Sequence, residues 1–399
     1  MTYKELLKLY KTGQLSDEQK KEIKADIEKQ EAISEFLFEN DDIPELRDSC
    51  LKAEIADNNS DFDEKRFQKM VKKSIRKAFL KLGIAVGVIV LAVILVVNTV
   101  MPNIIDTMYY DPTKITGTTD TGNQTSQISV DTMVYTELFT PGYYRNKAYA
   151  SHNGYGKYDV EIFQNFSING QISNVYGRID KNTLTLFSDS IFSLPAQNAF
   201  ATDNIPKLIG HAGTGAAGNQ ESALRKLGEL DKTDYYIAYV TFDKIMNYDE
   251  FSAWSKDNDI YPHWGAVCRK QDEKTFIADR ILGFNYFAFG GGHAYNFEKY
   301  PYLDYGDVIE SVDTDGFKIA SSDVMEKHMT SMLRYALDNE TFFEMAGCPI
   351  SDSELIMYIE SIEDYGLFTY GFAIVAQKDK ILEISNKENV NYIYTTPLL

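Results

Sequence analysis

The longest apolar run in the chain is Leu82 to Met101, LGIAVGVIVLAVILVVNTVM, which has no charged residue over twenty positions. A helix of this length rises about 30 Å, the hydrocarbon thickness of a bilayer. The alternative is a buried helix of a soluble core, which usually keeps polar residues along one face. Here the first strongly polar side chains are Asn98 and Thr99, near the far end. The pattern predicts a transmembrane helix over residues 82–101.

The charges beside this run predict its orientation. Eight Lys and Arg residues lie between Lys65 and Lys81, and the next basic residue is Lys114. Basic residues flank the cytoplasmic end of a membrane span, so the N-terminus is expected inside and the C-terminal part outside the plasma membrane. The residues expected at the membrane surface are Lys72, Lys73, Arg76, Lys77 and Lys81. The run begins too far from the N-terminus for a cleavable signal peptide.

Residues 61–81 also have a helical pattern of their own. Apolar residues recur at spacings of three and four, with the basic residues on the other face. This pattern predicts a basic amphipathic juxtamembrane helix that lies along the membrane or continues into the span.

The segment 1–60 carries two helix-start signals. Thr2 with Glu5 and Ser16 with Gln19 have the spacing of capping boxes, and Pro44 opens a third, shorter helical stretch. The apolar positions are too few to bury a core of their own. We therefore expect a helical hairpin whose apolar ridge binds a partner; the alternative is a flexible tail. The ridge consists of Leu6, Leu7, Tyr10, Ile23, Ile27, Phe36 and Leu37.

Charge suggests the chemistry of that partner. Between Ser16 and Asp48 there are twelve acidic and five basic residues. An acidic amphipathic hairpin would suit a basic partner, such as a protein whose own surface faces DNA. The alternative is an ordinary solvated helix face with ion pairs between successive turns.

Beyond the span, residues 102–132 include the polar stretch DPTKITGTTDTGNQTSQISVDT and predict a flexible linker. Residues 133–399 alternate between strand and helix patterns and predict an α+β fold, a sandwich-like domain outside the cell. Strands are expected at 158–163, 168–176, 183–187, 235–242, 263–268 and 368–376. Helices are expected at 248–256, 322–337 and from Ser351 to Gly366, the first and last opened by capping boxes.

This domain offers little sign of catalysis. His263 and Cys268 lie five apart on an expected strand and so point to opposite faces. The stretch GHAGTGAAG at 210–218 lacks the Lys and Ser/Thr of a phosphate-binding loop, and His293 has no suitably spaced metal partner. A loose calcium site remains an alternative among four carboxylates: Asp304, Asp307, Asp313 and Asp315. No catalytic, cofactor-binding or metal residues are predicted, and we expect no enzyme activity.

Composition narrows the partners further. The chain after residue 81 has 23 basic and 41 acidic residues, a net charge of −18. Such a domain is a poor direct ligand for nucleic acid or other anionic polymers. Cys268 and Cys348 leave open one disulfide, and no disulfide framework is indicated.

The ordered set of motifs resembles the sigma factor regulator family of Gram-positive bacteria, which are membrane-bound anti-sigma factors. The opening LLKLYKTGQLSDEQKKEIKADIEKQEAISEFLFE and the basic run with its span, KKSIRKAFLKLGIAVGVIVLAVILVVN, resemble the family's N-terminal region. MNYDEFSAW with HWGAV, then MEKHMTSMLRYALDNETFF and YIESIEDYGLFTYGFAIVA, are similar to its C-terminal domain.

The resemblance implies that the inner segment holds an extracytoplasmic-function sigma factor away from RNA polymerase while the outer domain responds to an envelope signal. One departure stands out: residues 1–81 have one cysteine and no histidine, so a His-x3-Cys-x2-Cys zinc motif is not present. Binding is therefore expected to need no zinc. The alternatives are a membrane-anchored cell-wall or carbohydrate-binding protein and a cell-wall enzyme. A cell-wall or envelope ligand is left open in every case.

Overall fold

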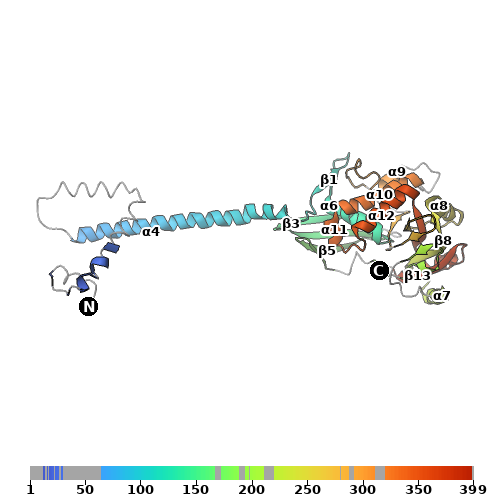
Figure 1. The fold of residues 1–399 in the computed structure, drawn as a ribbon, viewed down its shortest axis with the longest axis horizontal. Coiled ribbons are helices and arrows are strands. Elements are labelled where there is room, and N and C mark those ends of the chain that lie inside the picture. The colour runs from blue at the N-terminus through green and yellow to red at the C-terminus, as the bar shows by residue number, and fades with distance from the viewer. Residues whose placement is uncertain are drawn as a thin grey trace. The chain divides into compact units, whose positions relative to one another are not determined.

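The computed structural model describes residues 12–13, 16, 18–21, 23–26, 28–29, 64–166, 172–187, 194–196, 198–210, 220–278, 280–286, 292–310 and 320–397. The chain divides into two compact units, Met1–Val88 and Ile89–Leu399. Figure 1 follows the elements in chain order, beginning with α4 (Glu64–Leu95).

In the N-terminal unit the second capping box is confirmed. The Gln19 N–H donates to the Ser16 hydroxyl at 3.4 Å, and the Ser16 N–H donates to Gln19 Oε1 at 3.4 Å. Residues 18–21, 23–26 and 28–29 are helical, as expected. The helices predicted around Thr2 and Pro44 lie outside the described residues.

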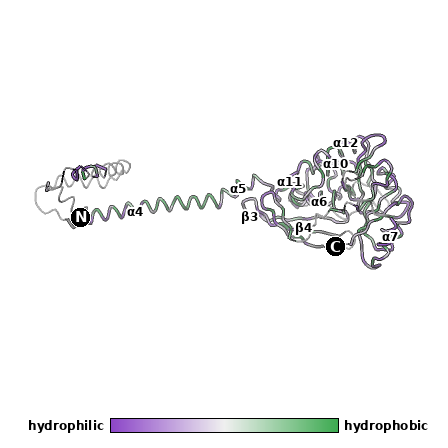
Figure 2. The backbone as a smooth tube through the Cα atoms, turned by 60° about the horizontal axis from the view of Figure 1, so that its bottom comes forward, coloured by the Kyte–Doolittle hydropathy of each residue, from purple (hydrophilic) through white to green (hydrophobic). Residues whose placement is uncertain are grey.

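The apolar run is helical throughout. The helix α4 continues through a π-helical turn, η1 (Val96–Val100), into α5 (Met101–Asp106). The resulting helix, Gln68–Asp106, has 39 residues and a mean hydropathy of 2.9 in its most apolar window, none of which is buried. It is long and apolar enough to cross a membrane, and it is green along much of its length in Figure 2. The alternative of a buried core helix is wrong, because the apolar side chains are exposed.

The juxtamembrane helix and the span predicted as separate segments therefore form one continuous helix. The π turn falls at the first polar residues. Asn98 Nδ2 and Thr99 Oγ1 each donate to a backbone carbonyl four residues earlier, on Ile94 and Leu95, at 2.7 Å. Such side chains compete for helix carbonyls, which explains why the regular pattern changes here.

The linker expected over residues 102–132 is wrong for most of its length. Strands β1 (Ile115–Thr118) and β2 (Gln124–Ser126) pair antiparallel, and α6 (Gln127–Phe139) begins inside the expected linker. Every residue of α6 is buried, including Gln127, Asp131 and Thr132. The polar side chains here form hydrogen bonds inside the domain. The polar sequence therefore did not indicate a solvent-exposed segment.

A four-stranded antiparallel sheet follows in the order β3-β4-β5-β6. Its strands are β3 (Tyr143–Gly154), β4 (Lys157–Phe166), β5 (Ile172–Asp180) and β6 (Thr183–Leu186). The predicted strands at 158–163 and 183–187 are confirmed, whereas β3 was missed. One face, with Ala148, Val160 and Val175, is buried in the same core as α6, and the other is exposed.

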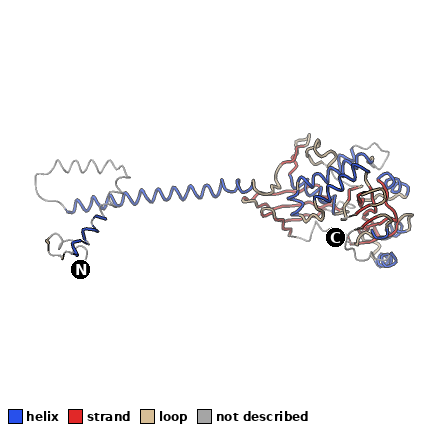
Figure 3. Tube along the Cα trace, in the orientation of Figure 1, coloured by secondary structure: helices blue, strands red, loops and turns tan. Residues whose placement is uncertain are grey.

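A seven-stranded sheet runs in the order β13-β8-β12-β9-β10-β7, with β11 also pairing with β9. Its strands are β7 (Leu208–Ile209), β8 (Tyr235–Asn247), β9 (Trp264–Lys270), β10 (Phe276–Ile277), β11 (Gly283–Asn285), β12 (Phe368–Gln377) and β13 (Val390–Pro397). Only β7 and β10 pair in parallel. Figure 3 shows these strands in red beside helices in blue.

The central strand β12 explains the arrangement. It lies between β8 and β9, and Phe372 pairs with Val240 on one side and Gly265 on the other. Phe372 and Ile374 face one apolar core, while Tyr370 and Val375 face a second. A strand buried on both faces reads as a continuous apolar run.

Helices complete the domain: α7 (Gln220–Glu229), α8 (Tyr248–Asp257), α9 (Tyr305–Glu310), α10 (Ser322–Asp338), α11 (Glu340–Met345), α12 (Asp352–Tyr365) and α13 (Lys378–Ser385), with a short 3-10 turn η2 (Thr202–Asn204). The capping boxes predicted for α8 and α12 are both present. The apolar face of α10 is buried in the core, with Met325, Met329, Met332, Leu333 and Ala336 buried and Leu337 half-buried. The α+β fold class is confirmed.

Candidate functional site

The helix α6 carries a carboxylate into the middle of the domain. Asp131 is fully buried, and its two oxygens accept hydrogen bonds from the Tyr110 hydroxyl at 2.5 Å and the Tyr335 hydroxyl at 2.7 Å. Gln127 Nε2 donates to the same carboxylate at 2.9 Å. Asp131 thus links the segment after the apolar helix, through Tyr110, to α10, through Tyr335.

Burial dominates the ionisation of this carboxyl. It raises the pKa of Asp131 from 3.8 to about 6, although the hydrogen bonds from Tyr110, Tyr335 and Gln127 oppose the shift. Burial and the nearby carboxylate raise the pKa of both tyrosines well above 10, so they remain donors. The cluster can therefore change its charge near pH 6.

A second buried pair lies two turns further along α6. His328 Nε2 lies 2.7 Å from Glu137 Oε1, and both side chains are almost completely enclosed. His328 Nδ1 lies 2.6 Å from the Tyr302 carbonyl, and the Asn285 N–H donates to Glu137 Oε1 at 2.9 Å. Because both neighbours of the imidazole are acceptors, His328 is best satisfied as the doubly protonated cation.

The pKa of His328 supports this protonation state. Burial lowers it, but the charge of Glu137 and the hydrogen bonds to Glu137 and the Tyr302 carbonyl raise it above its ordinary value. Trp264 Nε1 also donates to the Glu137 carbonyl at 2.6 Å. One turn of α6 is thereby fixed to β9, β11 and α10.

The end of the apolar helix is fastened to the β3–β4 turn. Asp106 Oδ2 lies 2.6 Å from His152 Nε2, and the Gly156 N–H donates to Asp106 Oδ1 at 2.5 Å. The Tyr155 hydroxyl donates to the Val97 carbonyl in the π turn. We call Val97, Asp106, His152, Tyr155 and Gly156 the joint.

The joint continues directly into the Asp131 cluster. Tyr110 lies four residues beyond Asp106, and its N–H donates to Asn182 Oδ1 at 3.0 Å while its hydroxyl reaches Asp131. A displacement of the helix end would therefore act on Asp131 through a short, hydrogen-bonded segment. This arrangement gives the domain a physical route for coupling its core to the helix.

We expect Asp106→Ala to open the joint locally. The Gly156 N–H would lose its acceptor, so its hydrogen exchange should speed up by roughly tenfold, the equivalent of about 1.4 kcal/mol. Hydrogen exchange followed by mass spectrometry over residues 150–160 measures this. Asp120→Ala, at an exposed position in the β1–β2 turn, is the control. Equal exchange in the two variants would show that Asp106 does not hold the turn.

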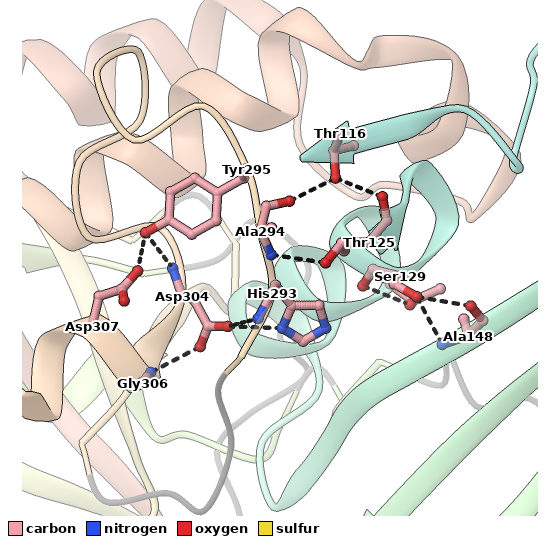
Figure 4. Close-up of polar contacts among 11 residues, drawn as sticks. Thr116, Thr125, Ser129, Ala148, His293, Ala294, Tyr295, Asp304, Gly306 and Asp307 are labelled. Atoms are coloured by element: carbon pink, nitrogen blue, oxygen red, sulfur yellow. Dashed lines mark hydrogen bonds and ion pairs between the residues drawn. The ribbon is translucent and has the colours of Figure 1, made fainter. Parts of the chain in front are cut away.

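A third pair lies beside α6, in the close-up of Figure 4. His293 Nδ1 lies 2.8 Å from Asp304 Oδ2, which also accepts the His293 N–H, and Asp304 Oδ1 accepts the Gly306 N–H at 2.8 Å. Burial raises the pKa of Asp304, but the histidine and these backbone bonds bring it below its usual value. The Tyr295 hydroxyl donates to Asp307.

These contacts contradict the loose calcium site at two of its four positions. The carboxylates of Asp304 and Asp307 accept hydrogen bonds from protein donors instead of facing a common cation. Asp313 and Asp315 lie outside the described residues. Among the residues with a described position, no group of three or more His, Cys, Asp and Glu side chains could hold a metal ion.

The structure also decides two further alternatives, the His263–Cys268 nucleophile pair and the Cys268–Cys348 disulfide. His263 Nδ1 accepts the Val375 N–H at 3.2 Å, and burial raises the pKa of the Cys268 thiol, so the two do not form a nucleophile pair. Cys268 and Cys348 are both free, which excludes the disulfide that the sequence left open.

The structure describes only some of the residues predicted to bind the partner or to flank the membrane. Ile23 is helical and 4% exposed. The remaining six ridge residues lie outside the described residues: Leu6, Leu7, Tyr10, Ile27, Phe36 and Leu37. All five expected membrane-flanking residues, Lys72, Lys73, Arg76, Lys77 and Lys81, are exposed on α4.

The described chain thus has a single apolar helix that could cross a membrane, joined to an α+β domain by the joint. Within that domain, residues 227–394 match the family model of the sigma factor regulator C-terminal domain. The resemblance to sigma factor regulators is confirmed over this segment, which is less than half of the chain. No curated protein and no solved structure matches.

The matched segment runs from the end of α7 into β13, so α6 lies outside it although α6 fills its core. The sequence analysis missed Asp131 and Glu137 because the expected boundary between linker and domain, at residues 132 and 133, falls inside α6. The available signal was the helical spacing of Ile128, Tyr135 and Leu138, which continues across that boundary.

Proposed function

We propose that this protein is a membrane-anchored anti-sigma factor that holds an extracytoplasmic-function sigma factor in the cytoplasm. The observation that carries the proposal is the match of residues 227–394 to the sigma factor regulator C-terminal family. The apolar helix Gln68–Asp106 supports anchoring in the plasma membrane. The exposed basic side chains on α4 support a cytoplasmic N-terminus and an outer C-terminal domain.

In this proposal the C-terminal domain responds to an envelope signal and the N-terminal ridge binds the sigma factor. The acidic charge of residues 16–48 would complement the basic, DNA-facing surface of such a partner. The joint and the Asp131 cluster would carry the response, since they connect the domain core with the helix by hydrogen bonds. The N-terminal segment would bind without zinc.

We favour a regulatory role over an enzymatic one. The most catalysis-like pair among the described residues is His293 with Asp304, whose side chains are 4% and 3% exposed. No hydroxyl or thiol is hydrogen-bonded to His293 Nε2 in the described structure. A buried pair without a nucleophile or an opening is a poor catalyst.

The full chain, solubilised in detergent and used as bait in lysate of the native organism, tests the proposal. We expect a sigma factor to be retained at one copy per chain, as identified by mass spectrometry. Retention of no sigma factor above background would refute the proposal and reduce the N-terminal segment to an anchor extension.

We expect the paired substitution Leu6→Asp with Leu7→Asp to release the sigma factor. Two charges in an apolar interface should cost at least about 2 kcal/mol, or roughly 30-fold in affinity, and should raise transcription from a sigma-dependent reporter. Ala25→Asp, on an exposed helical position of the same segment, is the control. Full repression in the paired variant would show that the ridge is wrongly placed.

A further inference from the structure

The sheet β3–β6 has one face that the described part of the domain leaves uncovered. Along its strands, buried and exposed side chains alternate, and the buried ones pack in the core with α6. On the uncovered face Tyr149, Tyr176 and Phe187 are 54%, 52% and 64% exposed. Large aromatic side chains gathered on one exposed face mark a binding surface.

The strand register places these rings in one row. Tyr149 on β3 lies opposite Glu161 on β4, and Glu161 lies opposite Tyr176 on β5. The Phe187 N–H donates to the Tyr176 carbonyl at 2.8 Å, which puts Phe187 next in the row. Since neighbouring strands lie about 4.8 Å apart, Tyr149 and Tyr176 are separated by roughly 10 Å. In the adjacent row, the Phe163 ring forms a T-shaped pair with the Tyr149 ring, and their centroids are 5.5 Å apart.

Polar side chains between and beside the rings are held in position by one another. Asn174 Nδ2 donates to Glu161 Oε1 at 2.8 Å, and Arg178 Nε donates to Asp159 Oδ1 at 3.0 Å. Asn153 Nδ2 donates to the other Asp159 oxygen at 2.8 Å. These donors and acceptors are ordered before any ligand arrives, which lowers the entropic cost of binding.

The charge of this face differs from that of the chain around it. Its described charged side chains balance, three basic and three acidic: Lys147, Lys157, Arg178, Asp159, Glu161 and Asp180. The chain after residue 81 has a net charge of −18. A neutral face in an acidic domain complements an uncharged ligand better than an ionic one.

We propose that this face binds an uncharged glycan chain. A sugar ring presents C–H groups on its faces and hydroxyls on its edge, which suits aromatic rings interleaved with carboxylate and amide groups. Tyr149, Tyr176 and Phe187 stack against sugars along the chain, while Glu161 and Asn174 hydrogen-bond to their hydroxyls. The inference deepens the proposed function, because it names the chemical class of an envelope ligand, and it rests on the outer placement of the domain.

Two other occupants fit less well. Single-stranded nucleic acid also stacks on aromatic rings, but it is bound in a positively charged groove, whereas this face is neutral. A second copy of the chain would need an apolar interface core over about 1,000 Å² or more. Here Glu161 interrupts the aromatic row, and the charged Asp159–Arg178 pair occupies the row beside it.

Retention of the full chain, in detergent, on immobilised uncharged glycans (chitin, cellulose, starch and mannan) tests the inference. We expect retention on at least one matrix, reduced at least tenfold by Tyr149→Ala with Tyr176→Ala. Tyr149→Phe with Tyr176→Phe keeps the stacking rings and should retain most of the binding. Tyr235→Ala with Tyr365→Ala removes two other exposed tyrosines of the same unit and should change nothing.

Each contrary result is decisive. No retention on any of the four matrices, equal retention of the two alanine pairs, or retention only on a heparin matrix would overturn the inference. The inference would also be overturned if the chain formed a dimer in sedimentation velocity and if Tyr149→Ala with Tyr176→Ala abolished this dimer without changing glycan retention. The sigma-factor experiment uses no glycan, so these failures leave the proposed function standing.

Discussion

Glu137→Ala is expected to destabilise the C-terminal unit by about 3–5 kcal/mol, because it leaves the His328 cation buried without a counter-charge. The Asn285 N–H would lose its acceptor at the same time. A loss of this size corresponds to a fall in Tm of roughly 10 °C in a domain of this size. Tryptophan fluorescence of the full chain in detergent follows the transition, since Trp264 lies against Glu137.

Two variants make this prediction specific. Glu363→Ala breaks an ion pair with Arg334 whose side chains are 48% and 47% exposed, and it should change the Tm by no more than about 2 °C. Glu137→Leu with His328→Leu removes both charges, so the paired variant should be more stable than Glu137→Ala alone by about 2 kcal/mol. If the paired variant is less stable than Glu137→Ala, the stability lost in Glu137→Ala does not come from an uncompensated charge on His328.

The stability of the same unit should fall as pH rises through the titration of Asp131. The folded-state pKa is about 6 against 3.8 in the ordinary state, so the folded chain holds the proton over that interval. The unfolding free energy contributed by this group is therefore greatest below about pH 4 and is lost by about pH 7. The shift of about two pKa units corresponds to about 3 kcal/mol.

Comparison with Asp131→Asn isolates this effect. The stability advantage of the wild type over the variant should shrink by about 3 kcal/mol between pH 4 and pH 7, measured by urea unfolding. His328 has a raised pKa and contributes a slope of the same sign at higher pH, but it is present in both proteins and cancels. A constant difference across the interval would show that Asp131 stays charged in the folded state.

Asp338 provides the matched control. It also accepts a tyrosine hydroxyl, from Tyr300 at 2.6 Å, but it is more exposed. Burial raises its pKa, while the hydrogen bonds from Tyr300 and Lys299 bring it below 3.8. Its contribution is present above pH 4 and lost only at lower pH, so Asp338→Asn should give a flat difference over pH 4–7.

Local signals in the sequence predicted the regular elements of the fold. The Asn247–Glu250 and Ser351–Glu354 capping boxes located α8 and α12, and the apolar run of β12 identified a strand buried on both faces. The uncharged run from Leu82 to Met101 identified the one helix that could cross a membrane among the described residues. These elements are determined by residues close together in the chain.

The candidate site could not be predicted in this way, because its pairs are distant in sequence. Glu137 and His328 are 191 residues apart, and Asp131 and Tyr335 are 204 apart. The polar residues at the start of α6 indicated a linker, since polar residues are usually exposed. Their burial costs little here because distant residues of the fold hydrogen-bond to them. His293 and Asp304 are separated by a loop that no short motif spans.

The place of α6 in the chain has a consequence for biosynthesis. As the chain emerges, Glu137 of α6 precedes its partners: Trp264 is made 127 residues after Glu137, and His328 follows later still. Until then Glu137 has none of these partners, although Asp131 already has Tyr110 and Gln127, so the core around Glu137 cannot close segment by segment. Folding must wait for nearly the whole chain, and it should be slow, as contacts between distant segments require. A newly made molecule would therefore pass through an interval in which its helix and the joint are made but the core around Glu137 is not yet closed.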